Sequence, residues 1–106
     1  MARAMGLALL ADKLPAEQAA AWGLIWAVHD DAVFGSEVDA LAARLAVMPT
    51  RALVRTRQLM QAAPTHTLEQ QLAMEGGFMR ELGRSADYVE GVSAFLDKRA
   101  PRFTGA

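Results

Sequence analysis

KLPAEQAAAWGLIWAVHDD, the stretch from Lys13 to Asp31, holds the start of a short helix, its end, an apolar run and a polar exit. Pro15 suits the first helical turn, where its missing N–H costs little, and the alanines after it are strong helix formers. Gly23 stands where helices commonly end in a left-handed residue. The run from Leu24 to Val28 is apolar and rich in strand-forming types, so it predicts a short extended segment. The stretch therefore predicts short helices with abrupt ends and one extended segment.

Apolar residues spaced three or four apart predict five further helices. The first is apolar nearly all round, so it needs cover on more than one side. We expect these helices at residues 2–11, 32–47, 51–63, 68–82 and 86–98. The expected caps are Ser36 with Asp39, which would start that helix after Gly35, then Thr50, Thr67 with Gln70, and Ser85. The predicted fold class is all-α, with about six short helices and one short extended segment in a single helical domain over residues 1–106.

The composition excludes several classes of protein. With 11 basic and 12 acidic residues the net charge is -1, which gives no overall attraction to nucleic acid or to a membrane surface. The absence of cysteine excludes disulfides and thiolate metal sites and fits a reducing cytoplasm, where we expect the protein to work. No apolar stretch is long enough to span a membrane.

Candidate catalytic and metal-binding residues are few. His29 and His66 are the only histidines, so a site with several histidines cannot form within one chain, and we predict no metal. Glu75 falls on an apolar stripe, where a buried carboxyl can act as a catalyst with a raised pKa. Pairing with an arginine across a helix interface is the commoner reason for a glutamate there. We therefore predict no catalytic residue in this chain.

The one basic cluster lies in the helix predicted at 51–63. Its arginines are Arg51, Arg55 and Arg57, with Arg44 nearby. Arginines on a helix can bind phosphates, and a nucleic-acid site here is one alternative. Because no aromatic residues interleave with them and the overall charge is near neutral, a solvated helix face is the better interpretation.

Phe95, Lys98 and Arg99 form the best candidate ligand site. An aromatic ring can pack on a nucleobase, and a lysine three residues further on shares its helix face and can reach a phosphate. The alternative is that Phe95 is a core residue and the two cations stabilise the negative end of the helix dipole.

Two pairs of residues are candidates for helix interfaces. Trp22 and Trp26 are large apolar anchors four residues apart, which favours packing over ligand binding. Gly76 and Gly77 weaken their helix by about 1 kcal/mol each relative to alanine, but could let another helix approach closely.

Two ordered segments resemble the crotonase-like family, the enoyl-CoA hydratases and isomerases. The first contains Pro15, Ala16, Glu17, Ala19, Gly23, Leu24 and Val28. The second contains Ser85, Asp87, Glu90, Gly91, Phe95, Lys98, Arg99, Pro101 and Phe103. Together they bracket nearly the whole chain, which corresponds to the C-terminal part of the family's usual length. The likeness is greatest to the phenylacetyl-CoA-type isomerases and hydratases of bacterial aromatic degradation.

The resemblance carries its own expectations. In that family this helical region mediates trimer formation and covers the acyl-CoA, and the end of its last helix contacts CoA, here through Phe95, Lys98 and Arg99. The family's catalytic carboxylates and oxyanion-binding N–H groups precede this region, so we expect the chain alone to be inactive and to self-associate. The substrate of the whole enzyme would be an acyl-CoA thioester, with no other cofactor. The alternative is a freestanding helical interaction module that no longer handles CoA.

Overall fold

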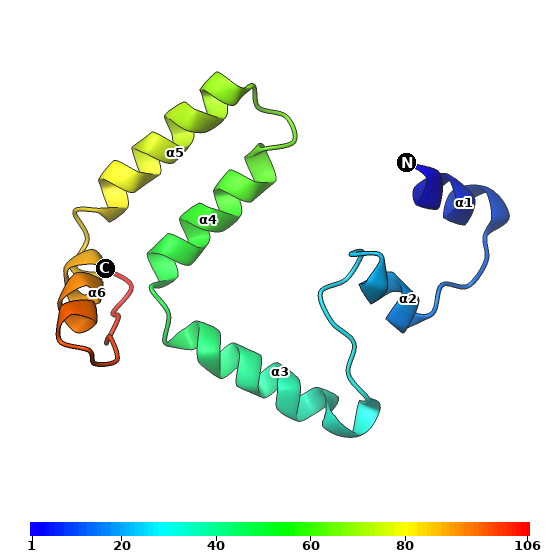
Figure 1. Cartoon of the computed structure of the whole chain (residues 1–106), viewed down its shortest axis with the longest axis horizontal. Helices are drawn as coiled ribbons and strands as arrows, with labels where there is room; N and C mark the ends of the chain where they lie inside the picture. The colour runs from blue at the N-terminus through cyan, green and yellow to red at the C-terminus, as the bar shows by residue number, and fades with distance from the viewer. The chain divides into compact units, whose positions relative to one another are not determined.

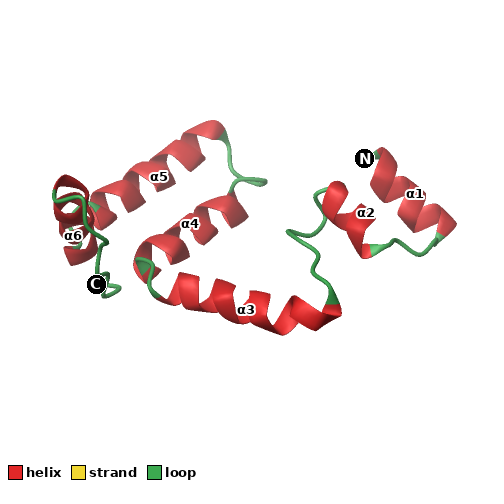
Figure 2. Cartoon of the chain, turned by 60° about the horizontal axis from the view of Figure 1, so that its bottom comes forward, coloured by secondary structure: helices red, strands yellow, loops and turns green.

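The computed structural model describes all 106 residues and contains six α-helices and no strand (Figures 1 and 2). The helices are α1 (Ala2–Leu10), α2 (Ala16–Ala21), α3 (Asp31–Ala46), α4 (Thr50–Ala62), α5 (Leu68–Leu82) and α6 (Ala86–Leu96). The all-α prediction is confirmed. The chain divides into two compact units, Met1–Val38 and Asp39–Ala106. The single-domain prediction stays a prediction.

The first unit holds α1, α2 and the apolar run that comes after them. Gly23 adopts a φ of 74°, as expected of a left-handed helix end, and the Leu24 N–H donates to the Ala19 carbonyl at 2.9 Å. Residues 24–28 lie outside any helix, as predicted, but they begin with bends and form no strand. A lone strand would leave its N–H and C=O groups without partners, and this chain offers no second strand.

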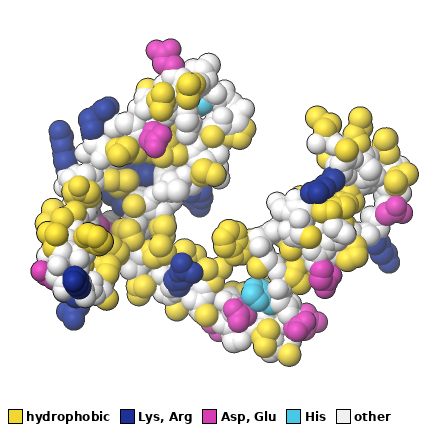
Figure 3. Space-filling view, in the orientation of Figure 1, with side chains coloured by type: hydrophobic (Ala, Val, Ile, Leu, Met, Phe, Trp, Pro, Cys, Tyr) yellow, Lys and Arg dark blue, Asp and Glu magenta, His cyan; other side chains and the backbone are white.

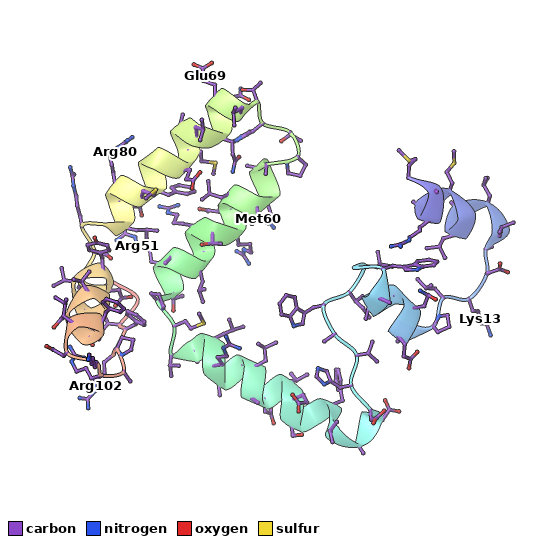
Figure 4. All side chains as sticks on the ribbon, viewed as in Figure 1. Lys13, Arg51, Met60, Glu69, Arg80 and Arg102 are labelled. Atoms are coloured by element: carbon purple, nitrogen blue, oxygen red, sulfur yellow. The ribbon has the colours of Figure 1, made fainter.

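In the second unit, α4 and α5 lie side by side and antiparallel (Figures 1 and 2). The predicted capping box starts α5: Thr67 Oγ1 accepts from the Gln70 N–H, and the Gln70 side chain accepts from the Thr67 N–H. Across the hairpin, Glu81 accepts from Arg51 and Arg55 at 2.8 and 2.9 Å, and Figure 4 shows Arg51 on the side of α4 that faces α5. The Arg55 guanidinium also lies 4.7 Å from the centre of the Phe78 ring. A charged cluster therefore holds this helix pair together.

Three helix ends differ from the prediction. Helix α3 begins at Asp31 and continues through Gly35, so Ser36 caps nothing and its hydroxyl donates to the Val33 carbonyl at 2.8 Å. Pro49, which cannot donate an N–H, occupies the N-cap of α4, and Thr50 lies inside the helix. Helix α6 ends at Leu96, because Lys98 turns left-handed with a φ of 53°. The predicted cap at Ser85 is confirmed, since its hydroxyl accepts from the Tyr88 N–H at 3.1 Å.

Few of the apolar residues are buried. Ala19 and Ala94 are the only buried hydrophobic residues, and no large side chain is fully enclosed. The apolar stripe predicted on α5 consists of Leu68, Leu72, Met79 and Leu82. The first three are 75%, 57% and 67% exposed, whereas Leu82 is half-buried. Figure 3 shows hydrophobic side chains gathered on the visible face of α6 and, in the other unit, of α1. These helices present apolar faces that the described residues leave uncovered.

Candidate functional site

The C-terminal end of α6 forms a Schellman turn with lysine at the left-handed position. The Arg99 N–H donates to the Ala94 carbonyl at 3.0 Å, and the Lys98 N–H donates to the Phe95 carbonyl at 3.3 Å. Glycine is the usual residue at such a position, because other side chains are strained there. Lys98 is exposed and makes no ion pair. Its ammonium group is therefore free to meet an anion.

Phe95 lies one turn before Lys98 and is 83% exposed. It lines a cavity of about 490 Å³ between the start of α4, α6 and the C-terminal segment. Most of the lining is apolar and includes Ala52, Leu82, Tyr88, Val92, Phe95 and Phe103. An apolar cavity lined by Phe95, with a free cation three residues further along the chain, suits a ligand that carries both a flat apolar group and a phosphate.

The C-terminal segment is docked on α6 through Asp87. Asp87 is 6% exposed, and its carboxylate accepts from the Thr104 N–H at 2.7 Å and from the Gly105 N–H at 2.9 Å. The Asp87 N–H in turn donates to the Ala106 carbonyl at 3.2 Å. One residue in the first turn of α6 therefore holds the last three residues.

Glu90 holds the preceding part of the same segment. Its carboxylate accepts from the Arg99 guanidinium at 2.6 and 2.9 Å and from the Arg102 N–H at 2.7 Å. Asp97 adds a weaker pairing with Arg99 at 3.5 Å. The Arg99 guanidinium, followed by the Arg102 N–H, lowers the pKa of Glu90 from its ordinary 4.5 to about 2. Glu90 in turn raises the pKa of Arg99.

The pKa of Glu90 predicts how the segment responds to acid. Because the folded value lies below the ordinary one, Glu90 stabilises the folded segment fully above pH 4.5, and this contribution is lost as the pH falls toward about 2. We expect the Arg102 N–H, followed by NMR through a pH titration, to shift with a midpoint near 2. A midpoint near 4.5 would contradict the pairing. In Glu90→Gln the titration should be absent.

The three predicted ligand residues thus have different surroundings. Phe95 and Lys98 are exposed and available, whereas the Arg99 guanidinium is occupied by Glu90. Sequence reasoning missed the role of Asp87 and Glu90, although both belong to the second family-like segment. Their signal was an acidic pair three residues apart on a helix that leads into a short segment rich in arginine.

Each of the two predicted interface pairs lies within a single unit of the chain. Trp22 is half-buried, with the Arg3 guanidinium 5.2 Å from its ring centre, while Trp26 is 95% exposed. Gly76 and Gly77 are about 100° apart around the axis of α5, so they face different directions. A Cβ at Gly77 would meet nothing within 4 Å, and one at Gly76 would meet only an arginine side chain. The described residues do not use the close approach that the two glycines would permit.

The other candidates take ordinary positions. Glu75 is exposed and pairs with no arginine, so the pairing predicted for it is wrong. Glu81 makes such a pairing across the helix interface instead, and its pKa is lowered mainly by Arg55. Glu81 binds Arg51 and Arg55, so a single carboxylate offsets part of the positive charge of the predicted basic cluster. No group of three or more metal-ligating side chains comes together. None of the helices is both long and apolar enough to cross a membrane.

Comparison with known proteins decides the family. The family model described as enoyl-CoA hydratase/isomerase matches residues 1–106, which is the whole chain. The chain belongs to the enoyl-CoA hydratase/isomerase family. The resemblance found in the two sequence segments is therefore confirmed.

Curated members of this family match nearly the whole chain. It is 54% identical over 104 residues to the 1,2-epoxyphenylacetyl-CoA isomerase of Escherichia coli (strain K12), covering 98% of this chain and 40% of that protein. It is 49% identical over 105 residues to a probable enoyl-CoA hydratase of Rhodobacter capsulatus, covering 99% of this chain and 41% of that protein. The chain therefore spans about two fifths of the length of these relatives.

A solved family structure has the same backbone course. The crystal structure of an enoyl-CoA hydratase from Polaromonas sp. JS666 aligns with a TM-score of 0.91 at 29% identity, covering 98% of this chain and 40% of that chain. The six helices are thus those of a known family region.

Proposed function

We propose that this chain is the helical region through which an enoyl-CoA hydratase/isomerase assembles and covers its acyl-CoA. The uncovered apolar faces of α1, α5 and α6 are the observation that carries this proposal. Faces of this kind need a partner surface, because exposed apolar area of this extent is costly in water. A second copy of the chain, in a trimer-type assembly, is the partner that family membership favours.

The end of α6 supports the CoA part of the proposal. The exposed Phe95 ring can stack on an adenine, and the Lys98 ammonium can bind a phosphate through a charge-assisted hydrogen bond. Arg99 would contribute positive charge while it stays paired with Glu90. The name of the Escherichia coli relative supports an aromatic acyl-CoA as the substrate of the whole protein.

We also propose that this chain alone does not catalyse the reaction. A general acid needs a carboxyl whose pKa is raised toward neutrality. Glu81 and Glu90 are instead shifted downward, and both are held by arginines. The chain supplies assembly and ligand contacts, with CoA thioester as substrate and no other cofactor. A cytoplasmic location stays a prediction.

Light scattering with and without CoA, together with an enoyl-CoA turnover assay, tests this proposal. We expect an oligomer, no turnover, and CoA binding that persists in the oligomer. Measurable turnover would overturn the inactivity, and a stable, fully folded monomer would overturn the assembly role. A monomer indifferent to CoA would favour the alternative, a freestanding helical interaction module.

A further inference from the structure

The unusual feature of the proposed CoA contact is its backbone. Lys98 keeps a left-handed conformation that favours glycine, and such a strained residue persists only where its surroundings hold it. After Lys98 the chain reverses its direction. The Schellman turn explains how this reversal begins, but not the course of the residues that follow. The residues beyond the turn make their own contacts with α6, and these contacts hold the course of the chain after Lys98.

The segment after Lys98 runs back along one face of α6. Glu90 holds Arg99 and Arg102, and Asp87, one turn nearer the start of the helix, holds Thr104 and Gly105. Phe103 closes over the helix between these contacts, with its ring 3.5 Å from the position of a Cβ on Gly91. Lys98 therefore lies where the chain reverses direction between α6 and the C-terminal segment, and the carboxylates of Asp87 and Glu90 join the two.

The two neighbouring cations have different roles in this arrangement. Arg99 is bound by Glu90 and Asp97, so its charge is largely used within the reversal. Lys98 has no carboxylate within ion-pair distance and is exposed, so its charge is unused. The reversal therefore presents one free ammonium from a fixed backbone, which limits the entropy lost on binding a phosphate.

We infer that Asp87 and Glu90 are positioning residues, which latch the C-terminal segment onto α6 and so hold Lys98 ready for a phosphate group of CoA. This inference rests on the proposed function, and it adds two residues that touch no ligand. Their effect on binding acts through Lys98.

A double-mutant cycle tests the inference, with CoA as the probe and hydrogen exchange as an independent measure of the latch. In Glu90→Gln and in Asp87→Asn the N–H groups of Arg102, Thr104 and Gly105 should exchange faster than in the unaltered chain. CoA affinity should fall about tenfold in each variant, which lies within the usual range of coupling between interacting sites. In a Lys98→Met background the same changes should alter CoA affinity by less than about twofold.

Matched controls separate the possible outcomes. Asp97→Asn also removes one negative charge, at the end of α6, but the Asp97 carboxylate accepts from no backbone N–H of the segment. This variant should therefore leave hydrogen exchange and CoA affinity nearly unchanged. Glu90 is partly exposed, so Glu90→Gln keeps the test usable if the buried change at Asp87 prevents folding. If the N–H groups of the segment exchange faster in Glu90→Gln or Asp87→Asn while CoA affinity is unchanged, the inference is wrong but the proposed function stands. The same conclusion follows if these changes lower CoA affinity equally with Lys98 and with Met at this position. A Lys98→Met chain that binds CoA normally would overturn the proposed CoA contact itself.

Discussion

Leu72→Glu should abolish the assembly that we propose for this chain and leave a monomer. Leu72 lies at the centre of the uncovered stripe on α5, between Leu68 and Met79, and is 57% exposed. Burying this leucine in an assembly stabilises it by about 1.5 kcal/mol or more, and burying an unpaired carboxylate there costs further free energy. We expect the dissociation constant of the assembly to rise at least about 100-fold, which corresponds to about 2.7 kcal/mol. Sedimentation over a range of concentrations measures it.

Ala73→Glu is the matched control for this experiment. It adds the same charge at the next residue of the same helix, about 100° away around the axis, and Ala73 is already exposed. Assembly should change little in this variant. If Leu72→Glu assembles as well as the unaltered chain, the stripe on α5 is not the assembly surface.

Lys98→Met should weaken CoA binding by about 10- to 100-fold. A hydrogen bond to a charged group contributes about 1.5–3 kcal/mol, and methionine keeps most of the side-chain length without the charge. Titration calorimetry with CoA measures the change. Lys13→Met is the control, because Lys13 is the only other lysine and is not among the residues proposed to contact CoA, so its loss should leave binding unchanged.

Lys98→Gly separates the charge from the backbone. Glycine adopts the left-handed conformation at φ 53° without strain, so the free energy of unfolding should rise by about 1 kcal/mol. CoA affinity should nevertheless fall as far as in Lys98→Met, because the ammonium is missing. A glycine variant that binds CoA as tightly as the unaltered chain would show that the turn, rather than the cation, makes the contact.

Sequence reasoning located the features that depend on neighbouring residues. Gly23 ends α2, Thr67 with Gln70 starts α5, and Ser85 caps α6, as predicted. Each of these signals acts between residues a few positions apart, so it does not depend on how the rest of the chain packs. The same reasoning failed at Ser36, where a helix that had already begun at Asp31 removed the need for a cap.

Pairing over longer separations could not be predicted in this way. Glu75 and Glu81 both lie on α5, and the apolar stripe made Glu75 the more conspicuous of the two. Glu81 is nevertheless the residue that meets Arg51 and Arg55, because α5 turns that face toward α4. The neighbouring helix decides which face of a helix becomes covered. When two faces of a helix could both pack, its sequence does not predict which one will.

By itself, the sequence determined the all-α class, most helix ends, the family and the candidate residues Phe95 and Lys98, because local propensity, caps and ordered motifs are properties of short stretches. Only the tertiary structure decided that Arg99 is bound by Glu90, that Asp87 holds the C-terminal segment, and that the apolar stripe of α5 remains uncovered. The first two join residues 9 to 17 positions apart. Contacts at such separations exist only once the chain has reversed its direction, and the reversal itself depends on the contacts that hold it.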